Sequence, residues 1–249
     1  ASGSSGNCIY VGTDTTHVLV DVGISRKRTE EGLKSLGICP GELDAIFVTH
    51  EHSDHISGLG VFSRKYNVPI YATTRTVDAI KGARSLGEID GELFQTVKAD
   101  ESFTIKDMTV NPMRISHDAA DPVAYRFSYG RQKIGVVTDL GTYNDYTVEC
   151  LKGMDALLLE ANHDVNMLQV GPYPYPLKQR ILGDRGHLSN ENSGRLLSRL
   201  LHDKLQYIVL GHLSKENNMP ELAYETVKLE ITQSDNCYKA GDFPIQVAK

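Results

Sequence analysis

Short apolar runs bounded by turn residues recur along the chain and predict β-strands. The predicted strands cover residues 8–11, 17–21, 45–48, 68–71, 93–97, 108–115, 123–128, 133–138, 156–160 and 207–210. Segments with helical periodicity predict helices at residues 25–36, 56–66, 74–85, 143–152, 190–201 and 219–231. Residues 164–188 contain several prolines, and we expect them to form a long loop, which is often functional when it is ordered.

The order of these elements distinguishes between fold classes. A single doubly wound parallel sheet alternates strand and helix throughout, whereas this chain places several strands in succession between residues 93 and 138. Two strand-rich halves with helices outside fit an α/β (α+β) fold of the four-layer αββα sandwich type. We expect one such domain over residues 1–249, with its first strand missing because the sequence begins without Met.

Composition places the chain among ordinary globular proteins. It has 249 residues, 40% hydrophobic and 23% charged, and a chain of this size can fold without a structural metal. Its net charge of −6 argues against the broad basic surface of a non-specific nucleic-acid binder, without excluding a local basic groove. No apolar run approaches the roughly 18 residues of a membrane span. We therefore expect no membrane partner. Because the 4 cysteines are widely separated, we expect reduced thiols and a cytoplasmic protein.

The strongest chemical signal is the segment His50-Glu51-His52-Ser53-Asp54-His55, which directly follows a predicted buried strand. Imidazole nitrogens and carboxylate oxygens are ligands of Zn²⁺, Mn²⁺ or Fe ions. Side chains two apart in an extended segment point the same way, so His50 and His52 can share one ion. Asp54 and His55 lie beyond a tight turn and can serve a second ion. A polar loop that caps a helix would explain a single HxH pair, but this density of ligands favours a site for two metal ions.

With this HxHxDH string the chain resembles the metallo-β-lactamase superfamily, and the resemblance extends over nearly the whole sequence. Asp21 matches the acidic residue that supports the metal loop, and each further matching position also follows a predicted strand. The resemblance implies that one ion is held by His50, His52, His117 and Asp139. It implies a second ion held by Asp54, His55, Asp139 and His212, so that Asp139 bridges the two.

A narrower resemblance points to a substrate. Asp139 stands where common metallo-β-lactamases carry Cys, so we do not expect β-lactam hydrolysis. The strings at 2–8, 160–164, 186–192 and 211–218 resemble the YycJ (WalJ) group of bacterial double-stranded DNA exonucleases. This resemblance implies a phosphodiesterase that cleaves duplex DNA through a hydroxide bridging the two metals, with a role in DNA repair. It names DNA, as a duplex or a strand end, as the partner, and no protein partner can be inferred from it.

Two other functions remain open from the sequence. Glyoxalase-II-like thioester hydrolases use much the same ligand set, although this chain shows no separate C-terminal helical domain. The other alternative is a non-catalytic, metal-dependent module with a DNA-binding or regulatory role. The complete ligand set argues against it, because a degenerate member would usually have lost a ligand.

Further residues are expected to act on the substrate. Asp54 is expected to orient the attacking hydroxide as well as bind metal, and His187 to donate a proton or hydrogen bond to the leaving oxygen. His187 precedes a predicted helix N-terminus, which binds phosphate well when cations are near. The expected phosphate contacts are Lys178, Arg180 and Arg185, together with Ser5 and Asn7 in a Ser/Gly-rich segment with accessible backbone amides. His163 is either an ordinary loop histidine or a supporting hydrogen-bond partner of the site.

The segment Gly171-Pro172-Tyr173-Pro174-Tyr175-Pro176 places two tyrosines on a stiff, proline-rich stretch. One interpretation is a loop that packs against its own domain. The other is an element on which nucleic-acid bases stack or which separates strands. The sequence leaves both open.

Overall fold

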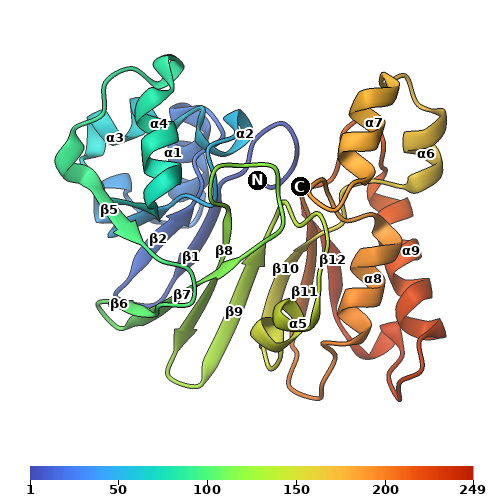
Figure 1. The fold of residues 1–249 in the computed structure, drawn as a ribbon. Coiled ribbons are helices and arrows are strands. Elements are labelled where there is room, and N and C mark those ends of the chain that lie inside the picture. Colours follow the sequence, from blue (N-terminus) through green and yellow to red (C-terminus); the bar gives the residue numbers. More distant parts are fainter. Residues whose placement is uncertain (249) are drawn as a thin grey trace. The chain divides into compact units, whose positions relative to one another are not determined.

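The computed structural model describes residues 1–248. The chain divides into two compact units, whose elements are labelled in Figure 1. The first unit comprises residues 1–113 and 119–129, and the second comprises residues 114–118 together with the chain from Gly130 onward. No helix within residues 1–248 is both long enough and apolar enough to cross a bilayer.

The first unit contains most of the predicted strands and the first four helices. The strands are β1 (Ile9–Gly12), β2 (His17–Val20), β3 (Ala45–Phe47), β4 (Ile70–Thr73), β5 (Phe94–Val97), β6 (Phe103–Ile105), β7 (Met108–Arg114) and β8 (Val123–Tyr129). The helices are α1 (Arg26–Ser35), α2 (Ser53–Ile56), α3 (Leu59–Tyr66) and α4 (Thr74–Gly82), with short 3-10 turns at Pro40–Glu42, Arg84–Leu86 and Gly91–Leu93. A five-stranded sheet has the order β1-β2-β3-β4-β5, in which β1 and β2 form an antiparallel hairpin and the other neighbours are parallel.

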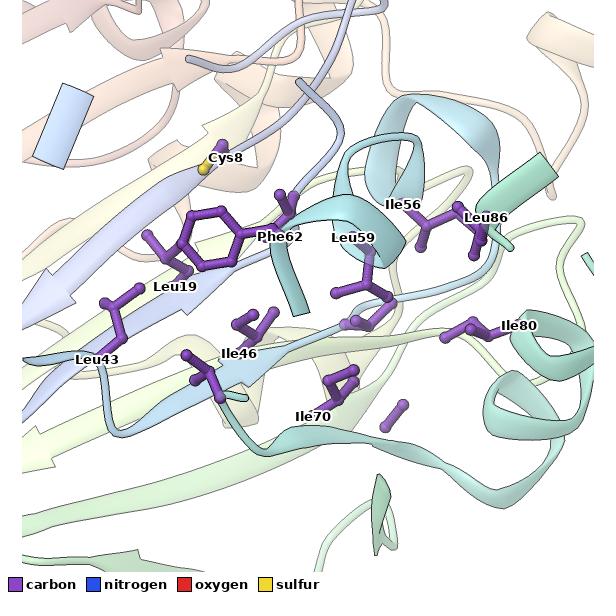
Figure 2. Close-up of a cluster of buried hydrophobic side chains, with 14 of the residues drawn as sticks. Cys8, Leu19, Leu43, Ile46, Ile56, Leu59, Phe62, Ile70, Ile80 and Leu86 are labelled. Atoms are coloured by element: carbon purple, nitrogen blue, oxygen red, sulfur yellow. The ribbon is translucent and has the colours of Figure 1, made fainter. Parts of the chain in front are cut away.

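One face of this sheet packs against helices. Leu19 of β2, Ile46 of β3 and Ile70 of β4 project into a buried cluster, where they meet Phe62 of α3 and Ile80 of α4 (Figure 2). Alternate residues of a strand face opposite sides, so only every second residue of these short strands contributes to this cluster. Burying side chains of this size stabilises the fold by about 1.5–3 kcal/mol each.

The opposite face of the sheet packs against a second layer of strands. Phe47, next to Ile46 on β3, has its ring centroid 5.1 Å from Tyr125 and 5.6 Å from Phe127, both on β8. It also lies 6.0 Å from Phe103 on β6, and these distances are typical of aromatic pairs in a core. The second layer has the order β8-β7-β6. Helices, sheet and second sheet therefore stack as successive layers, as the sequence predicts.

The second unit is built on a parallel sheet. Its strands are β9 (Gln132–Val137), β10 (Ala156–Glu160), β11 (Tyr207–Gly211) and β12 (Ile245–Val247), in the order β12-β11-β10-β9. Its helices are α5 (Asp145–Leu151), α6 (Val165–Val170), α7 (Tyr175–Leu182), α8 (Asn190–Ser198) and α9 (Pro220–Gln233), with a 3-10 turn at Ala240–Asp242. α8 crosses α9 closely because Gly194 lacks a side chain; a Cβ there would stand 2.6 Å from the Cβ of Glu230. Parallel strands bring their carboxyl ends to one edge, where functional loops gather.

The α/β class is confirmed, but one prediction about its elements is wrong and two short strands were not predicted. Residues 164–188 are not one long loop, because α6 and α7 form within them. Asp164 caps α6, and Pro176 stands in the first turn of α7, where the fixed φ of proline suits a helix. Strands β6 and β12 are absent from the predicted set, because each has 3 residues with a polar residue in the middle and shows no apolar run.

The aromatic contact between the two strand layers should dominate the stability of the first unit. We expect Phe47→Ala to lower the free energy of unfolding by about 3–5 kcal/mol, because it removes a buried ring and leaves a cavity. Val61→Ala, at an exposed position of α3, is the control and should change it by less than about 0.5 kcal/mol. Urea denaturation of both variants tests this, and equal midpoints would contradict the packing described.

Candidate metal centre

In the first unit the candidate ligands follow β3, which pairs in parallel with β2, so that the carboxyl ends of the two strands lie together. Asp21 comes directly after β2 with a left-handed backbone, φ 62°. Its carboxylate accepts hydrogen bonds from the backbone N and Oγ1 of Thr49, at 2.8 and 2.9 Å, and lies 2.7 Å from His55 Nδ1. Burial raises the pKa of Asp21, although the charge of His55 and these hydrogen bonds oppose the shift. Asp21 therefore anchors the loop that contains His55.

Within this loop the candidate ligands fall into two pairs. His50 Nε2 lies 3.0 Å from His52 Nδ1, and Asp54 Oδ2 lies 3.4 Å from His55 Nε2. Two ligands of one tetrahedral zinc ion, each bound at about 2.0–2.1 Å, stand about 3.3 Å apart. Each pair thus has the spacing of two ligands on one ion. Because Asp21 binds the Nδ1 atom of His55, the Nε2 atom of that ring is the one that can bind a metal.

The N-terminal segment supports the same loop through backbone hydrogen bonds. The backbone N of Asn7 donates to Asp54 O at 2.7 Å, and Gly23 N donates to Asn7 O at 2.7 Å. A Cβ at Gly23 would stand 1.6 Å from Asp54 O, so only glycine fits there. The Asn7 side chain is fully buried, and its Nδ2 lies 3.1 Å from His55 Nε2, whereas Ser5 is exposed. Asn7 thus contacts a candidate ligand, and the predicted substrate contacts of Ser5 and Asn7 remain predictions.

In the second unit the candidate ligands surround Asp139. Its Oδ1 atom lies 3.5 Å from His117 Nε2, and its Oδ2 atom lies 3.6 Å from His212 Nε2. These distances exceed the about 2.7–3.2 Å of a hydrogen bond and are close to the about 3.3 Å between ligands of one ion. Asp139 and His212 have left-handed backbones, φ 56° and 53°, which Asp and His adopt more readily than most residues. The two oxygens of one carboxylate therefore face two different imidazoles.

Glu160, the last residue of β10, holds this arrangement together. Its Oε1 atom lies 2.8 Å from His187 Nδ1 and 2.7 Å from His212 Nδ1. Its Oε2 atom accepts hydrogen bonds from the backbone N atoms of Leu140 and Leu188, at 2.7 and 3.2 Å. Burial raises the pKa of Glu160, but the charges and hydrogen bonds of the two histidines outweigh it and lower that pKa to about 2. Glu160 was not among the site residues predicted from the sequence, although it is the only charged residue of an otherwise apolar strand.

His187 is the partly exposed histidine of this cluster. Its side chain is 21% exposed, and its Nδ1 atom lies 3.5 Å from Asp139 Oδ1. Burial lowers the pKa of His187, but the charge and hydrogen bond of Glu160 outweigh it and leave that pKa raised. The hydrogen bond of Nδ1 to Glu160 leaves Nε2 as the atom that can meet a substrate. The backbone N of His187 donates to Ile181 O at 3.0 Å, which holds its loop against α7.

His163 contributes to the second unit mainly through its backbone. It forms a parallel bridge with Ser189, and its carbonyl accepts a hydrogen bond from Asn190 N at 2.9 Å. Its Nδ1 atom lies 3.3 Å from Asn162 Oδ1. Burial lowers the pKa of His163 to about 4, so its ring is neutral at physiological pH. His163 therefore ties the loop after β10 to the segment that begins α8.

Each of the three cations predicted to bind phosphate has a partner within the second unit. These partners are Asp118 for Arg180, the carbonyl of His117 at 3.0 Å for Arg185, and the carbonyl of Gln169 at 2.7 Å for Lys178. Only the partner of Arg180 is charged, so Lys178 and Arg185 keep a net positive charge. The N-terminus of α8 is capped by Ser189 Oγ, which accepts a hydrogen bond from Asn192 N at 3.3 Å. These contacts position the cations, and their binding to phosphate remains a prediction.

The structure thus contains clustered His, Asp and Glu residues able to bind metal. One cluster lies within the second unit, where ligand atoms of Asp139, Glu160, His187 and His212 lie within 4.8 Å of one another. Both oxygens of Glu160 already accept hydrogen bonds, so this residue supports the histidines. Asp139 and His212 are therefore the better metal ligands. The donors are imidazoles and carboxylates, a set that suits Zn²⁺, Mn²⁺ or Fe.

Comparison with known proteins identifies relatives over nearly the whole chain. A family profile described as "Beta-lactamase superfamily domain" matches residues 16–209. Exodeoxyribonuclease WalJ of Streptococcus pneumoniae serotype 2 is 42% identical over 235 residues, which cover 94% of this chain and 87% of the relative. Exodeoxyribonuclease YycJ of Bacillus anthracis is 42% identical over 227 residues, which cover 91% of this chain and 85% of the relative.

Solved structures match the fold as well. The metallo-beta-lactamase fold protein YhfI from Bacillus subtilis has a TM-score of 0.73 and 16% sequence identity. The match covers 100% of this chain and 90% of that one. At this level of identity the likeness concerns the fold alone, and it confirms the fold predicted from the sequence.

Glu160 should control metal affinity through its hydrogen bonds to the ligands, although it does not bind the metal itself. We expect Glu160→Gln to weaken metal binding by about 10- to 100-fold, because the amide nitrogen cannot accept hydrogen bonds from a pair of donors. Competition with a chromophoric zinc chelator measures this affinity. Glu149→Gln, on α5 with a side chain 65% exposed, is the matched control. Equal affinities for the two variants would show that Glu160 does not orient the ligands.

Proposed function

Because the chain belongs to the metallo-β-lactamase superfamily, we propose that it is a metal-dependent exonuclease that hydrolyses the phosphodiester bonds of double-stranded DNA. The observation that carries this proposal is the identity of 42% to exodeoxyribonuclease WalJ over 94% of the chain. The clustered imidazoles and carboxylates support it, since metal ions bound by such groups assist phosphoryl transfer.

The proposed site would hold two divalent ions, of Zn, Mn or Fe. His50, His52 and His117 would share one ion with Asp139, and Asp54, His55 and His212 would share the other with it. The pairing of ligands from the first unit with ligands from the second follows the family pattern. Within each unit the ligand spacing supports two ions: the first unit separates its ligands into two pairs, and in the second unit the oxygens of Asp139 face two different imidazoles. Such ions supply Lewis-acid stabilisation of negative charge and a nucleophile from water at neutral pH.

His187 is the residue best placed to handle the proton of the leaving group. Glu160 holds its ring by Nδ1 and raises its pKa, which favours the protonated ring near neutral pH. A protonated imidazole can donate its Nε2 proton to the 3′ or 5′ oxygen that leaves phosphorus, which is general acid catalysis. Glu160 then stabilises the ring by accepting the remaining N–H. The partial exposure of His187 lets a substrate reach it.

Asp54 is proposed to orient the attacking water as well as to bind metal. Its carbonyl is fixed by Asn7 N at 2.7 Å, so the backbone that carries its carboxylate is rigid. A carboxylate held in this way can accept a proton from water while keeping its position, which lowers the entropy lost in reaching the transition state. Lys178 and Arg185 are proposed to attract the phosphates of the substrate.

The proposal is tested by offering the purified protein a panel of substrates with Mn²⁺. End-labelled duplex DNA, single-stranded DNA, RNA and a glutathione thioester are incubated separately and the products are resolved. We expect nucleotides to be released from the ends of duplex DNA, and the thioester to remain intact. Hydrolysis of the thioester without cleavage of any nucleic acid would replace the nuclease by the glyoxalase-II-like alternative. Metal-dependent DNA binding without cleavage would support the non-catalytic alternative instead.

His187→Ala should separate catalysis from metal binding. We expect kcat on duplex DNA to fall by about 100-fold or more, because the leaving oxygen loses its proton donor. Metal content should stay unchanged, since His187 is outside the proposed ligand set. His202→Ala is the control, because that histidine binds only the carbonyl of Met154 at 3.0 Å and a backbone N of its own loop. A His187→Ala variant with normal turnover would remove His187 from the mechanism.

A further inference from the structure

The α6–α7 hairpin, residues 165–183, presents the most exposed large apolar side chains of residues 1–248. Val170 is 86% exposed and Tyr175 is 73% exposed, and Leu182 adds a third exposed apolar side chain. α7 has no buried residue at all. Of the two tyrosines in the proline-rich segment, Tyr175 is therefore mostly exposed to solvent, whereas Tyr173 is half-buried.

Although these side chains are exposed, the hairpin is held in place by a buried side chain and by hydrogen bonds. Leu168 of α6 is fully buried, and Asp164 Oδ1 caps α6 by accepting a hydrogen bond from Met167 N at 2.7 Å. Lys178 on α7 donates to the carbonyl of Gln169 on α6 at 2.7 Å. A Cβ at Gly171 would lie 2.7 Å from Met167 O, so the turn between the helices is tight. Tyr175 is thus presented by a fixed scaffold.

The hairpin is connected directly to the histidines of the second unit. Ile181 O, in the last turn of α7, accepts the backbone N–H of His187. Gly186 packs so closely on that turn that a Cβ would stand 2.1 Å from Ile181 O. Arg180 pairs with Asp118, the neighbour of His117. A substrate that reaches His187 therefore arrives beside α7.

The charge of the hairpin favours a polyanion. Residues 165–183 contain Lys178 and Arg180 and no Asp or Glu, in a chain whose net charge is −6. Asp118 offsets the charge of Arg180, so Lys178 supplies the net positive charge. An exposed aromatic ring next to a cation, with no acidic residue in the same element, suits single-stranded nucleic acid: bases stack on the ring and phosphates meet the cation.

We propose that the α6–α7 hairpin binds the unpaired end of a DNA strand, with Tyr175 as the surface on which a terminal base stacks. This inference rests on the proposed nuclease function, because an exonuclease must separate the last nucleotides from the complementary strand before their phosphate reaches His187. Stacking on Tyr175 would stabilise the separated end. The hairpin thus makes the enzyme select strand ends.

The test compares Tyr175→Ala with Tyr207→Ala, an equally simple truncation of a tyrosine that is 55% exposed at the start of β11. Fluorescence anisotropy without added metal measures binding of a fluorescein-labelled single strand and of a duplex with an unpaired end. We expect Tyr175→Ala to weaken both by about five-fold or more, the lower end of what stacking one base contributes. Tyr207→Ala should bind as the unaltered protein does. Digestion with Mn²⁺ should slow more on blunt duplex than on duplex with an unpaired end.

The outcomes separate this inference from the nuclease proposal. Equal binding and digestion by the two variants, with the unaltered protein still digesting DNA, would overturn the role of the hairpin and leave the nuclease standing. If single strands bind in a way that depends on Tyr175 but the unaltered protein does not digest DNA, the DNA-binding role of the hairpin is supported and the proposed nuclease function is overturned. If Tyr175→Ala changes only self-association in sedimentation velocity, the surface belongs to a second copy of the chain and the inference is wrong. Circular dichroism establishes that both variants are folded.

Discussion

The chemistry of the second unit depends on one buried carboxylate that satisfies four donors. Glu160 accepts hydrogen bonds from the rings of His187 and His212 on one oxygen and from two backbone N–H groups on the other. A charged carboxylate is costly to bury unless it is paired and hydrogen-bonded, and here both conditions hold. The same contacts fix the loops after β9 and before α8, so the geometry of the candidate ligands follows from the position of Glu160 at the end of β10.

The first unit uses the same arrangement with different residues. Asp21 follows β2 as a buried carboxylate and binds His55 Nδ1 at 2.7 Å, the same distance that joins Glu160 Oε1 to His212 Nδ1. In both units the carboxylate selects the tautomer with hydrogen on Nδ1, which leaves Nε2 as the atom that can bind a metal. Residues that never touch a metal can thus determine how strongly it binds. His187 is held in the same way but is partly exposed, which suits a proton donor better than a ligand.

Parts of this account were accessible from the sequence because they depend on residues that are close along the chain. The segment from His50 to His55 shows its ligand density directly, and the apolar runs before it predict the strands that position it. The role of Glu160 was not accessible, because it arises where three loops meet at the carboxyl edge of a parallel sheet. The α6–α7 hairpin was predicted as a loop because prolines suggest a break. Proline is in fact compatible with the first turn of a helix, where Pro176 stands.

We propose that ligands from the first unit and ligands from the second would serve one pair of metal ions, with Asp139 as a ligand of both. Anomalous scattering from crystals grown with Mn²⁺ tests it most directly, because the peaks locate the ions independently of activity. We expect two peaks, both within ligand distance of Asp139, one also bound by His50 and the other by Asp54. A single peak, or peaks whose ligands come from only one unit, would contradict it.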